Sequence, residues 1–279
     1  MIARTSFCGL LVAVMATLGA VPAIAADSSR LELDATAIGF TSPQNTYGPW
    51  QFQNLHYVYV IPGEGALNVE FSHQTDKDTG NFQNGYYIAL GLVRDFTPYL
   101  YGVVDFGAGT ANPYAKSLLH TELAYKIPAD WRWQIDGSED FIGYQSGQSL
   151  RQTMVGPNYI SRTFAVQMRY LVQVNSGATT QSGAYAALDV MPTRRSKYTV
   201  TGLWGPQQYL TQVGALPLTL ANLDGQTYTL GTEQQIGPTN SLGQRLGVRV
   251  LGFYSHLNRV GGSPLYIGRG VTLGFWSQF

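Results

Sequence analysis

Charged residues are scarce in this chain of 279 residues. They make up 12% of the sequence, against about 25% in ordinary soluble domains. The 17 basic and 17 acidic residues cancel, so the chain lacks the basic excess that nucleic-acid-binding proteins direct at phosphates. The composition therefore argues against a nucleic-acid binder and does not favour an ordinary soluble domain.

Cysteine and long apolar runs are also nearly absent. The single cysteine, Cys8, lies in residues 1–25, which combine a basic start, an uncharged apolar stretch from Phe7 to Ala20 and the small-x-small sequence Ala23-Ile24-Ala25. These are the parts of a secretory signal peptide, and we expect cleavage after them. The apolar stretch is too short to span a bilayer comfortably. The exported chain, residues 26–279, would then contain no thiol and no disulfide.

Tyrosine and glycine, in contrast, are abundant, with 18 and 32 residues, and the mean hydropathy is −0.06. Apolar and polar residues alternate with period two along much of the chain, which predicts strands with one apolar face and one polar face. Segments 151–160 and 197–204 alternate least clearly, so we expect an even number of strands from twelve to fourteen. The candidate strands are 30–40, 51–61, 65–75, 85–96, 99–107, 117–127, 131–141, 151–160, 163–175, 183–191, 197–204, 227–236, 244–256 and 266–279.

Two features of these strands favour a membrane barrel over a soluble β-sandwich, in which apolar faces share a core. The polar faces carry small and charged residues at mid-strand, as a wet lumen does. Aromatic residues gather at strand ends, where the girdles of membrane barrels meet the lipid headgroups; they are Tyr57, Tyr59, Tyr86, Tyr99, Tyr101, Trp131, Trp133, Tyr266 and Trp276. The predicted fold is all-β: a single transmembrane antiparallel up-and-down β-barrel of about 12–14 strands, with residues 26–279 forming one domain.

The last strand, 266–279, ends on an aromatic residue. Its polar-x-Gly-x-x-aromatic-x-aromatic register is typical of the final strand that the barrel-assembly machinery of the bacterial outer membrane recognises. Thr272, Gly274 and Phe279 fit this pattern, whereas Ser277 stands where an aromatic is expected. Together with the signal peptide, this ending predicts export to the outer membrane.

The connections are predicted to be short on one side of the barrel and long on the other. Pro62-Gly63-Glu64-Gly65, Pro128-Ala129-Asp130 and Pro157-Asn158 are typical of short turns. Longer connections are expected at 76–84, 108–116, 142–150, 176–182, 205–226 and 257–265. In barrels of this class the short turns face the periplasm and the long loops face outward.

The chain resembles the YaiO family of outer-membrane barrels over most of residues 28–279. The resemblance rests on Trp50 before the second strand, on Asn112-Pro113-Tyr114 before the strand 118–126, and on the closing Gly-x-x-x-Gly-Phe strand. The chain departs from the family pattern at Ser277 and in the long segment from Pro206 to Gln226. The resemblance implies a barrel fold and an outer-membrane location, and it brings no activity and no catalytic residues.

The polar faces of the predicted strands carry charges of both signs. We expect these side chains to line the lumen and pair into a network, because the two signs are nearly balanced and a strongly ion-selective pore would show one sign in excess. The candidate lumen charges are Glu70, Asp105, Glu122, Lys126, Arg132, Asp136, Arg169, Asp189, Glu233, Arg245 and Arg249. His56 and His120 are expected to face the lumen as hydrogen-bonded residues rather than as metal ligands, since no third ligand accompanies them.

No convincing catalytic constellation is present. A lipid hydrolase needs a serine activated by histidine, but in Ser72-His73 and Ser255-His256 the two side chains would point to opposite faces of a strand. Asp76-x-Asp78, in an apparent outer loop, lacks the partner histidine of a rim protease and the later glutamate of a calcium loop. The sequence predicts no enzyme, no cofactor and no metal site.

The leading hypothesis is a structural or passive-passage barrel for a small polar or saccharide solute, with a lumen largely filled by polar side chains. Its expected partners are outer-membrane lipid and lipopolysaccharide, the barrel-assembly machinery and that solute. Two alternatives stay open: an outer-membrane enzyme acting on lipid or lipopolysaccharide, and a secreted soluble β-sandwich that binds carbohydrate through its tyrosines.

Overall fold

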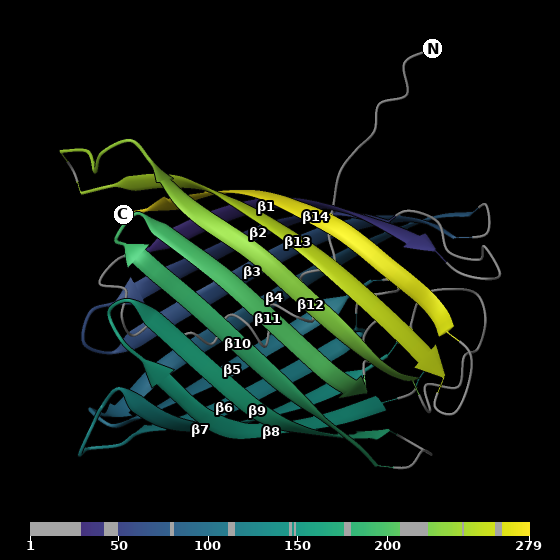
Figure 1. The fold of residues 1–279 in the computed structure, drawn as a ribbon, viewed down its shortest axis with the longest axis horizontal. Coiled ribbons are helices and arrows are strands. Elements are labelled where there is room, and N and C mark those ends of the chain that lie inside the picture. The colour runs from purple at the N-terminus through teal and green to yellow at the C-terminus, as the bar shows by residue number, and fades with distance from the viewer. Residues whose placement is uncertain are drawn as a thin grey trace.

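The computed structural model is a closed barrel of fourteen antiparallel strands (Figure 1). Each strand pairs with its neighbours in sequence, and the last strand also pairs with the first, so the sheet has no free edge. The structure describes residues 29–41, 50–78, 81–110, 115–144, 147, 149–175, 180–206, 223–241, 243–259 and 264–279. The predicted signal peptide, residues 1–25, and the turn Asn112-Pro113-Tyr114 lie outside the described residues.

The strands run in a simple up-and-down order and number fourteen, the upper limit of the predicted range. Both weakly alternating segments are strands and fall within β8 and β11. The bounds are β1 Arg30–Thr41, β2 Trp50–Ile61, β3 Gly65–Asp78, β4 Asn81–Thr97, β5 Leu100–Gly109, β6 Ser117–Lys126, β7 Trp133–Gly143, β8 Ser149–Ile160, β9 Phe164–Asn175, β10 Gln181–Thr193, β11 Ser196–Pro206, β12 Leu223–Ile236, β13 Arg245–Arg259 and β14 Pro264–Gln278. Within the part of the chain that the structure describes, no helix is long and apolar enough to cross a membrane.

The two ends of the barrel follow the predicted division into short and long connections only in part, because 237–244 is long at one end and 79–80 is short at the other. Arg30 and Gln278 are register partners, so the first and last strands begin and end at the same end of the barrel, which we call the turn end. The connections at the turn end are 62–64, 98–99, 127–132, 161–163, 194–195 and 237–244. The opposite end, the loop end, carries 42–49, 79–80, 110–116, 144–148, 176–180, 207–222 and 260–263, including the longest connection of the chain.

Two predicted connections are wrong. Pro157-Asn158 is not a turn, because both residues lie inside β8. The ladder to β9 runs up to Val155 and resumes at Asn158, so proline, which has no N–H to donate, stands where no partner on that side is paired. The expected loop 76–84 is mostly strand, since β3 continues to Asp78 and β4 begins at Asn81.

The outward face of the barrel is apolar, in agreement with the predicted alternation. Large apolar side chains stand exposed all round the barrel, for example Leu90 at 57%, Phe106 at 60% and Leu230 at 67%. Their polar neighbours in sequence face the interior, and Ser72 is fully buried there. An apolar exterior combined with a polar interior is the arrangement that a membrane-spanning barrel requires.

The aromatic residues at strand ends do not all face outward. Tyr59, Tyr86, Tyr99, Trp131 and Trp133 are exposed on the outer surface, as a girdle requires. In contrast, Tyr101 and Trp276 are buried inside the barrel and Tyr57 is half-buried; the side chain of Tyr266 lies outside the described residues. The girdle prediction is therefore wrong for Tyr101 and Trp276, whose strand parity turns them inward.

Glycines on the inner face make room for inward aromatic rings. A Cβ atom added at Gly107 would lie 1.9 Å from the hydroxyl of Tyr87, and one added at Gly247 would lie 2.2 Å from the ring of Trp276. Each ring thus occupies the space that a side chain on the neighbouring strand would fill. These close approaches bring the aromatic side chains against the barrel wall.

Candidate functional site: the barrel lumen

The lumen is lined by polar and charged side chains, many of which the structure buries almost completely. Because side chains alternate across the sheet, every second residue of each strand faces the interior. Gln74, Gln152, Gln173 and Thr272 are each only 1% exposed. Solvent therefore does not reach large parts of this lining, and the interior is filled by the protein's own side chains.

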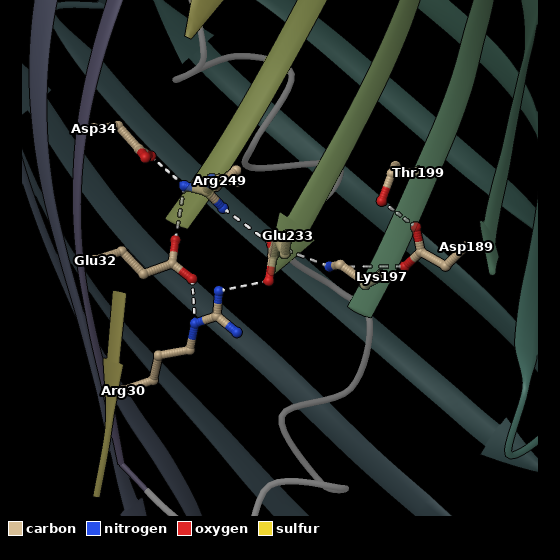
Figure 2. Close-up of polar contacts among 8 residues, drawn as sticks. All are labelled: Arg30, Glu32, Asp34, Asp189, Lys197, Thr199, Glu233 and Arg249. Carbon is tan, nitrogen blue, oxygen red and sulfur yellow. Dashed lines mark hydrogen bonds and ion pairs between the residues drawn. The ribbon is translucent and has the colours of Figure 1, made fainter. Parts of the chain in front are cut away.

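One group of charges, the Arg249 cluster, lies near the turn end on the wall formed by β1 and β10 to β13 (Figure 2). Arg249 Nη2 lies 2.9 Å from Glu32 Oε2 and also pairs with Asp34, while Arg249 Nη1 lies 3.6 Å from Glu233 Oε1. Figure 2 shows this guanidinium between the two acids of β1 and the acid of β12. The Arg249 cluster comprises Arg30, Glu32, Asp34, Asp189, Lys197, Glu233 and Arg249.

Two further cations complete the Arg249 cluster. Lys197 Nζ lies 3.2 Å from Glu233 Oε1 and 4.0 Å from Asp189 Oδ2. Arg30 Nη2 lies 2.9 Å from Glu233 Oε2, and Thr199 Oγ1 donates a hydrogen bond to Asp189 at 2.6 Å. Each carboxylate of this cluster therefore faces at least one cation, as buried charges require.

A second group, the Arg169 cluster, lies on β6, β7 and β9 and comprises Glu122, Asp136 and Arg169. Arg169 Nη2 lies 3.2 Å from Glu122 Oε2 and Arg169 Nε lies 2.8 Å from Asp136 Oδ1, with all three side chains fully buried. Asn158 of β8 donates a hydrogen bond to Asp136. One guanidinium thus lies between two carboxylates where water does not reach.

A row of polar residues runs across the wall from β5 to β9, one residue from each strand, and its side chains are hydrogen-bonded from His120 of β6 onward. Asp105, His120, Asp140, Gln152 and Gln173 are successive register partners along it. His120 Nδ1 lies 2.6 Å from Asp140 Oδ1, Gln152 Nε2 donates to Asp140 Oδ2 at 2.8 Å, and Gln173 Nε2 donates to Gln152 Oε1 at 2.5 Å. His120 faces the lumen as a hydrogen-bonded residue.

Two of the predicted lumen charges, Arg132 and Lys126, do not belong to either cluster. Arg132 is an exposed turn residue whose Nε donates to Asp130 Oδ1 at 2.8 Å, because the strand begins only at Trp133. This hydrogen bond lowers the pKa of Asp130 below its ordinary value. Arg132 therefore does not line the lumen. Lys126 ends β6 with its ammonium 5.7 Å from the ring centroid of Tyr101 and belongs to neither cluster.

Other predicted residues fall into different parts of the lumen. Asp189, Glu233 and Arg249 meet in the Arg249 cluster, whereas Arg245 begins β13 at the turn end. Glu70 accepts a hydrogen bond from Ser72 at 3.1 Å and belongs to neither cluster. The expected charges thus form separate groups along the walls rather than one network across the lumen.

The prediction that acidic and basic side chains are nearly balanced in the lumen is wrong. Glu32, Asp34, Asp140 and Lys197 have the same inward parity as recognised lumen residues, and that parity is the signal that would have identified them. Among the strand residues whose side chains the structure describes, ten carboxylates and six basic side chains have inward parity. This count includes residues at the two ends of the barrel. The acids are Glu32, Asp34, Glu70, Asp95, Asp105, Glu122, Asp136, Asp140, Asp189 and Glu233, and the bases are Arg30, Lys126, Arg169, Lys197, Arg245 and Arg249.

Apolar side chains pack inside the barrel at both of its ends. Toward the loop end, two neighbouring groups share Leu118; they are Ile38, Trp50, Phe52, Tyr87 and Phe253, and Ile142, Tyr144 and Leu150. Toward the turn end, an inner apolar cluster on β2 to β6 contains Val58, Val60, Ala66, Val93, Tyr101, Val103 and Ala124. The charged middle of the lumen is thus enclosed between apolar layers on this side of the barrel.

The serine and histidine pairs considered as catalytic are separated by the barrel wall. Ser72 and Ser255 are buried inside, while His73 is on the outer face, where it stacks on Tyr86 at 4.8 Å between ring centroids. His120, the one inward histidine bonded to a carboxylate, has no serine partner among the described hydrogen bonds. The side chains of Asp76 and Asp78 lie outside the described residues.

No group of three or more His, Cys, Asp or Glu side chains is placed to hold a metal ion within the described ranges.

The residues of the predicted assembly signal lie along the closing seam. Thr272 hydrogen-bonds Thr36 of β1 inside the barrel, and the carboxylate of Asp34 lies over Gly274. Phe279 is exposed at the turn end and stacks on Tyr57 at 6.4 Å between ring centroids. These contacts tie β14 to β1 and β2.

The chain matches no protein-family model, and no curated protein resembles it in sequence. Among solved structures, it is similar to the CymD monoaromatic hydrocarbon channel, with a TM-score of 0.56 at 8% identity over 91% of this chain and 88% of that one. It is also similar to the translocator domain of the autotransporter NalP from Neisseria meningitidis, with a TM-score of 0.50 at 12% identity over 95% and 94% of the two chains. At these identities the likeness shows the fold, which is that of outer-membrane β-barrels.

Proposed function

We propose that the protein is an integral barrel of the bacterial outer membrane that passes a small solute through a lumen largely filled by its own side chains. The observation that carries this proposal is the inversion of polarity, with exposed Leu90 and Phe106 outside and buried Arg169 and Glu122 inside. Lipid surrounds such an exterior favourably, and a polar lumen leaves a route for solutes. The exposed aromatic residues at the strand ends support this location.

The charge of the lumen narrows the class of solute. Ten inward carboxylates against six inward bases, among the described strand side chains, attract cations and repel anions. The filled interior restricts passage to small molecules and implies low conductance. We therefore propose a small polar solute, neutral as a saccharide is or positively charged, rather than an anion.

Membership of the YaiO family is part of the same proposal. It is supported by the barrel fold and by Thr272, Gly274 and Phe279, which lie along the closing seam as an assembly signal would. An outer-membrane location implies two further partners, the barrel-assembly machinery and lipopolysaccharide.

Recordings in planar lipid bilayers test the passage function. We expect small, cation-preferring currents from the purified protein, and uptake of small sugars but not of anions of the same size into liposomes that contain it. A wide, steady pore would contradict the filled lumen. A silent barrel that cleaves outer-membrane lipids would overturn the proposal in favour of an enzyme.

A matched variant strengthens the recording. Replacing Arg249 by Ser removes the guanidinium between Glu32, Asp34 and Glu233, so cation preference and conductance should both rise. Replacing Arg94, which is exposed and pairs with Glu64 at the turn end, should change neither.

A further inference from the structure

Two lumen carboxylates, Glu70 and Asp105, differ from those of the Arg249 and Arg169 clusters because no lysine or arginine among the described residues pairs with them; the charged group nearest to Asp105 is the imidazole of its register partner His120. Glu70 of β3 accepts a hydrogen bond from Ser72, and Asp105 of β5 bonds to Asn68. Among the residues that the structure describes, neither carboxylate forms an ion pair with a lysine or arginine. Both are half-buried and close enough to repel each other. A site with this charge attracts a cation.

Aromatic side chains border the same part of the lumen. Tyr87 of β4 is buried and lies near enough to both Glu70 and Asp105 to interact electrostatically with them. It packs in one cluster with Trp50 and Phe52, whose rings lie edge to face at 6.0 Å between centroids. Aromatic faces attract cations and also accept the apolar body of an organic molecule.

A buried acceptor adds an independent observation. The amide oxygen of Asn54 on β2 has no hydrogen-bond partner among the described residues, and its side chain is 9% exposed. Asn54 faces inward and is the register partner of Ser72, the residue that donates to Glu70. An unsatisfied buried acceptor costs free energy unless a donor reaches it. A ligand with several N–H donors would supply one.

We propose that Glu70, Asp105 and Asn54, together with the rings of Phe52 and Tyr87, form a binding site for a small organic cation, namely a primary ammonium on an aromatic body. The ammonium has three donors, which two carboxylates and one amide oxygen can accept. The ring of the ligand packs against the aromatic side chains toward the loop end. This site deepens the proposed passage function, because it names the substrate class that the acidic lumen selects.

The aromatic layer distinguishes this site from one for an inorganic ion. Within the described residues no three metal-ligating side chains are grouped for a metal. Apolar rings beside two carboxylates suit a cation that carries its own apolar surface. The chemistry therefore points to an organic ammonium.

Isothermal titration calorimetry on the folded protein in detergent micelles tests the site with three probes of the same shape. Benzylammonium, benzyl alcohol and benzoate share an aromatic body and differ in charge. We expect benzylammonium to bind at least about tenfold more tightly than benzyl alcohol, since each hydrogen bond to a charged group contributes that much, and benzoate to bind least. Equal affinities for all three probes, or no measurable binding of benzylammonium, would overturn the proposal.

Variants locate the site. The double variant Glu70→Gln, Asp105→Asn removes two charges that no described lysine or arginine pairs with, so the barrel should fold, as heat-modifiable migration on gels will report. We expect the preference for benzylammonium over benzyl alcohol to fall about tenfold or more, while binding of benzyl alcohol stays the same. The control Glu64→Gln removes an exposed carboxylate at the turn end and should leave all three affinities unchanged. A preference that survives the double variant places the cation elsewhere and refutes the assignment.

The outcome separates this proposal from the passage function. Calorimetry in micelles reports binding without transport, whereas bilayer recordings report passage. If the barrel binds benzylammonium selectively but passes no solute, the binding site is supported and the passage function is overturned. Passage without selective binding would overturn the site alone.

Discussion

Replacing Arg169 by Met should destabilise the barrel more than any other single change in the lumen. The guanidinium lies 3.2 Å from Glu122 and 2.8 Å from Asp136, and all three side chains are fully buried. Methionine has a similar length and no charge, so two carboxylates would remain buried beside each other without a cation. Breaking a buried pair in this way costs about 3–5 kcal/mol in other proteins.

The same reasoning predicts that removing the two carboxylates restores the stability lost in Arg169→Met. Replacing Glu122 by Gln and Asp136 by Asn in the Arg169→Met background removes the uncompensated charges. Most of the lost free energy of unfolding should return, because neutralising every member of a buried ion group is often close to neutral for stability. The coupling between the sites, the difference between the combined and separate effects, isolates the ion pairs from the change in packing.

Urea unfolding in lipid vesicles, followed by tryptophan fluorescence, measures these differences. As a control, Arg94→Met breaks an ion pair with Glu64 that is half exposed on both sides, and it should cost less than about 1 kcal/mol. If Arg169→Met costs no more than this control, or if the triple variant is less stable than the single one, the buried-pair reasoning is wrong.

The outer face gives a second prediction: Leu90→Arg, on the exposed apolar belt, should cost about 2–4 kcal/mol in vesicles, whereas Thr199→Arg, on the acid-rich inner wall, should cost less; equal costs would refute the assignment of faces. Deleting Phe279 should lower the amount of barrel in outer-membrane fractions if Phe279 acts in the proposed assembly signal, and normal insertion of the shortened chain would contradict that role. Gly107→Ala should displace the Tyr87 ring, whose hydroxyl occupies the position of the new methyl group, and alter single-channel conductance; an unchanged conductance would show that this ring does not border the path.

The alternation of side chains allowed much of the fold to be predicted without coordinates. Period two is a local property of each strand, so the inward parity of Glu122 and Arg169 and the outward parity of Leu90 could be assigned from neighbours alone. The short connection at 62–64 was recognisable from proline and glycine, and the structure places it at the turn end. The faces of the strands, and some of the short turns, follow from local pattern.

Local sequence pattern gave wrong predictions where the outcome depended on where a strand begins or where its pairing is interrupted. Arg132 shares the parity of Gln134 but precedes the first residue of β7, so it pairs with Asp130 in the turn instead of entering the lumen. Pro157 has the chemistry of a turn residue, yet its strand continues because the ladder on one side is interrupted there. Both depend on where neighbouring strands stop pairing, which one segment does not encode.

Closure of the barrel decided which charges meet. Arg249 and Asp34 are 215 residues apart in the chain, and they are brought together because β14 pairs with both β13 and β1. The number of strands and their register set this meeting, and neither can be derived from the alternation of any strand. By itself, the sequence determined that an apolar outer face and a polar inner face exist, since that depends on residue order. Only the tertiary structure decided that Arg249 and Arg169 are paired with carboxylates while, among the described residues, no lysine or arginine pairs with Glu70 or Asp105, since that depends on how the strands are staggered around the closed sheet.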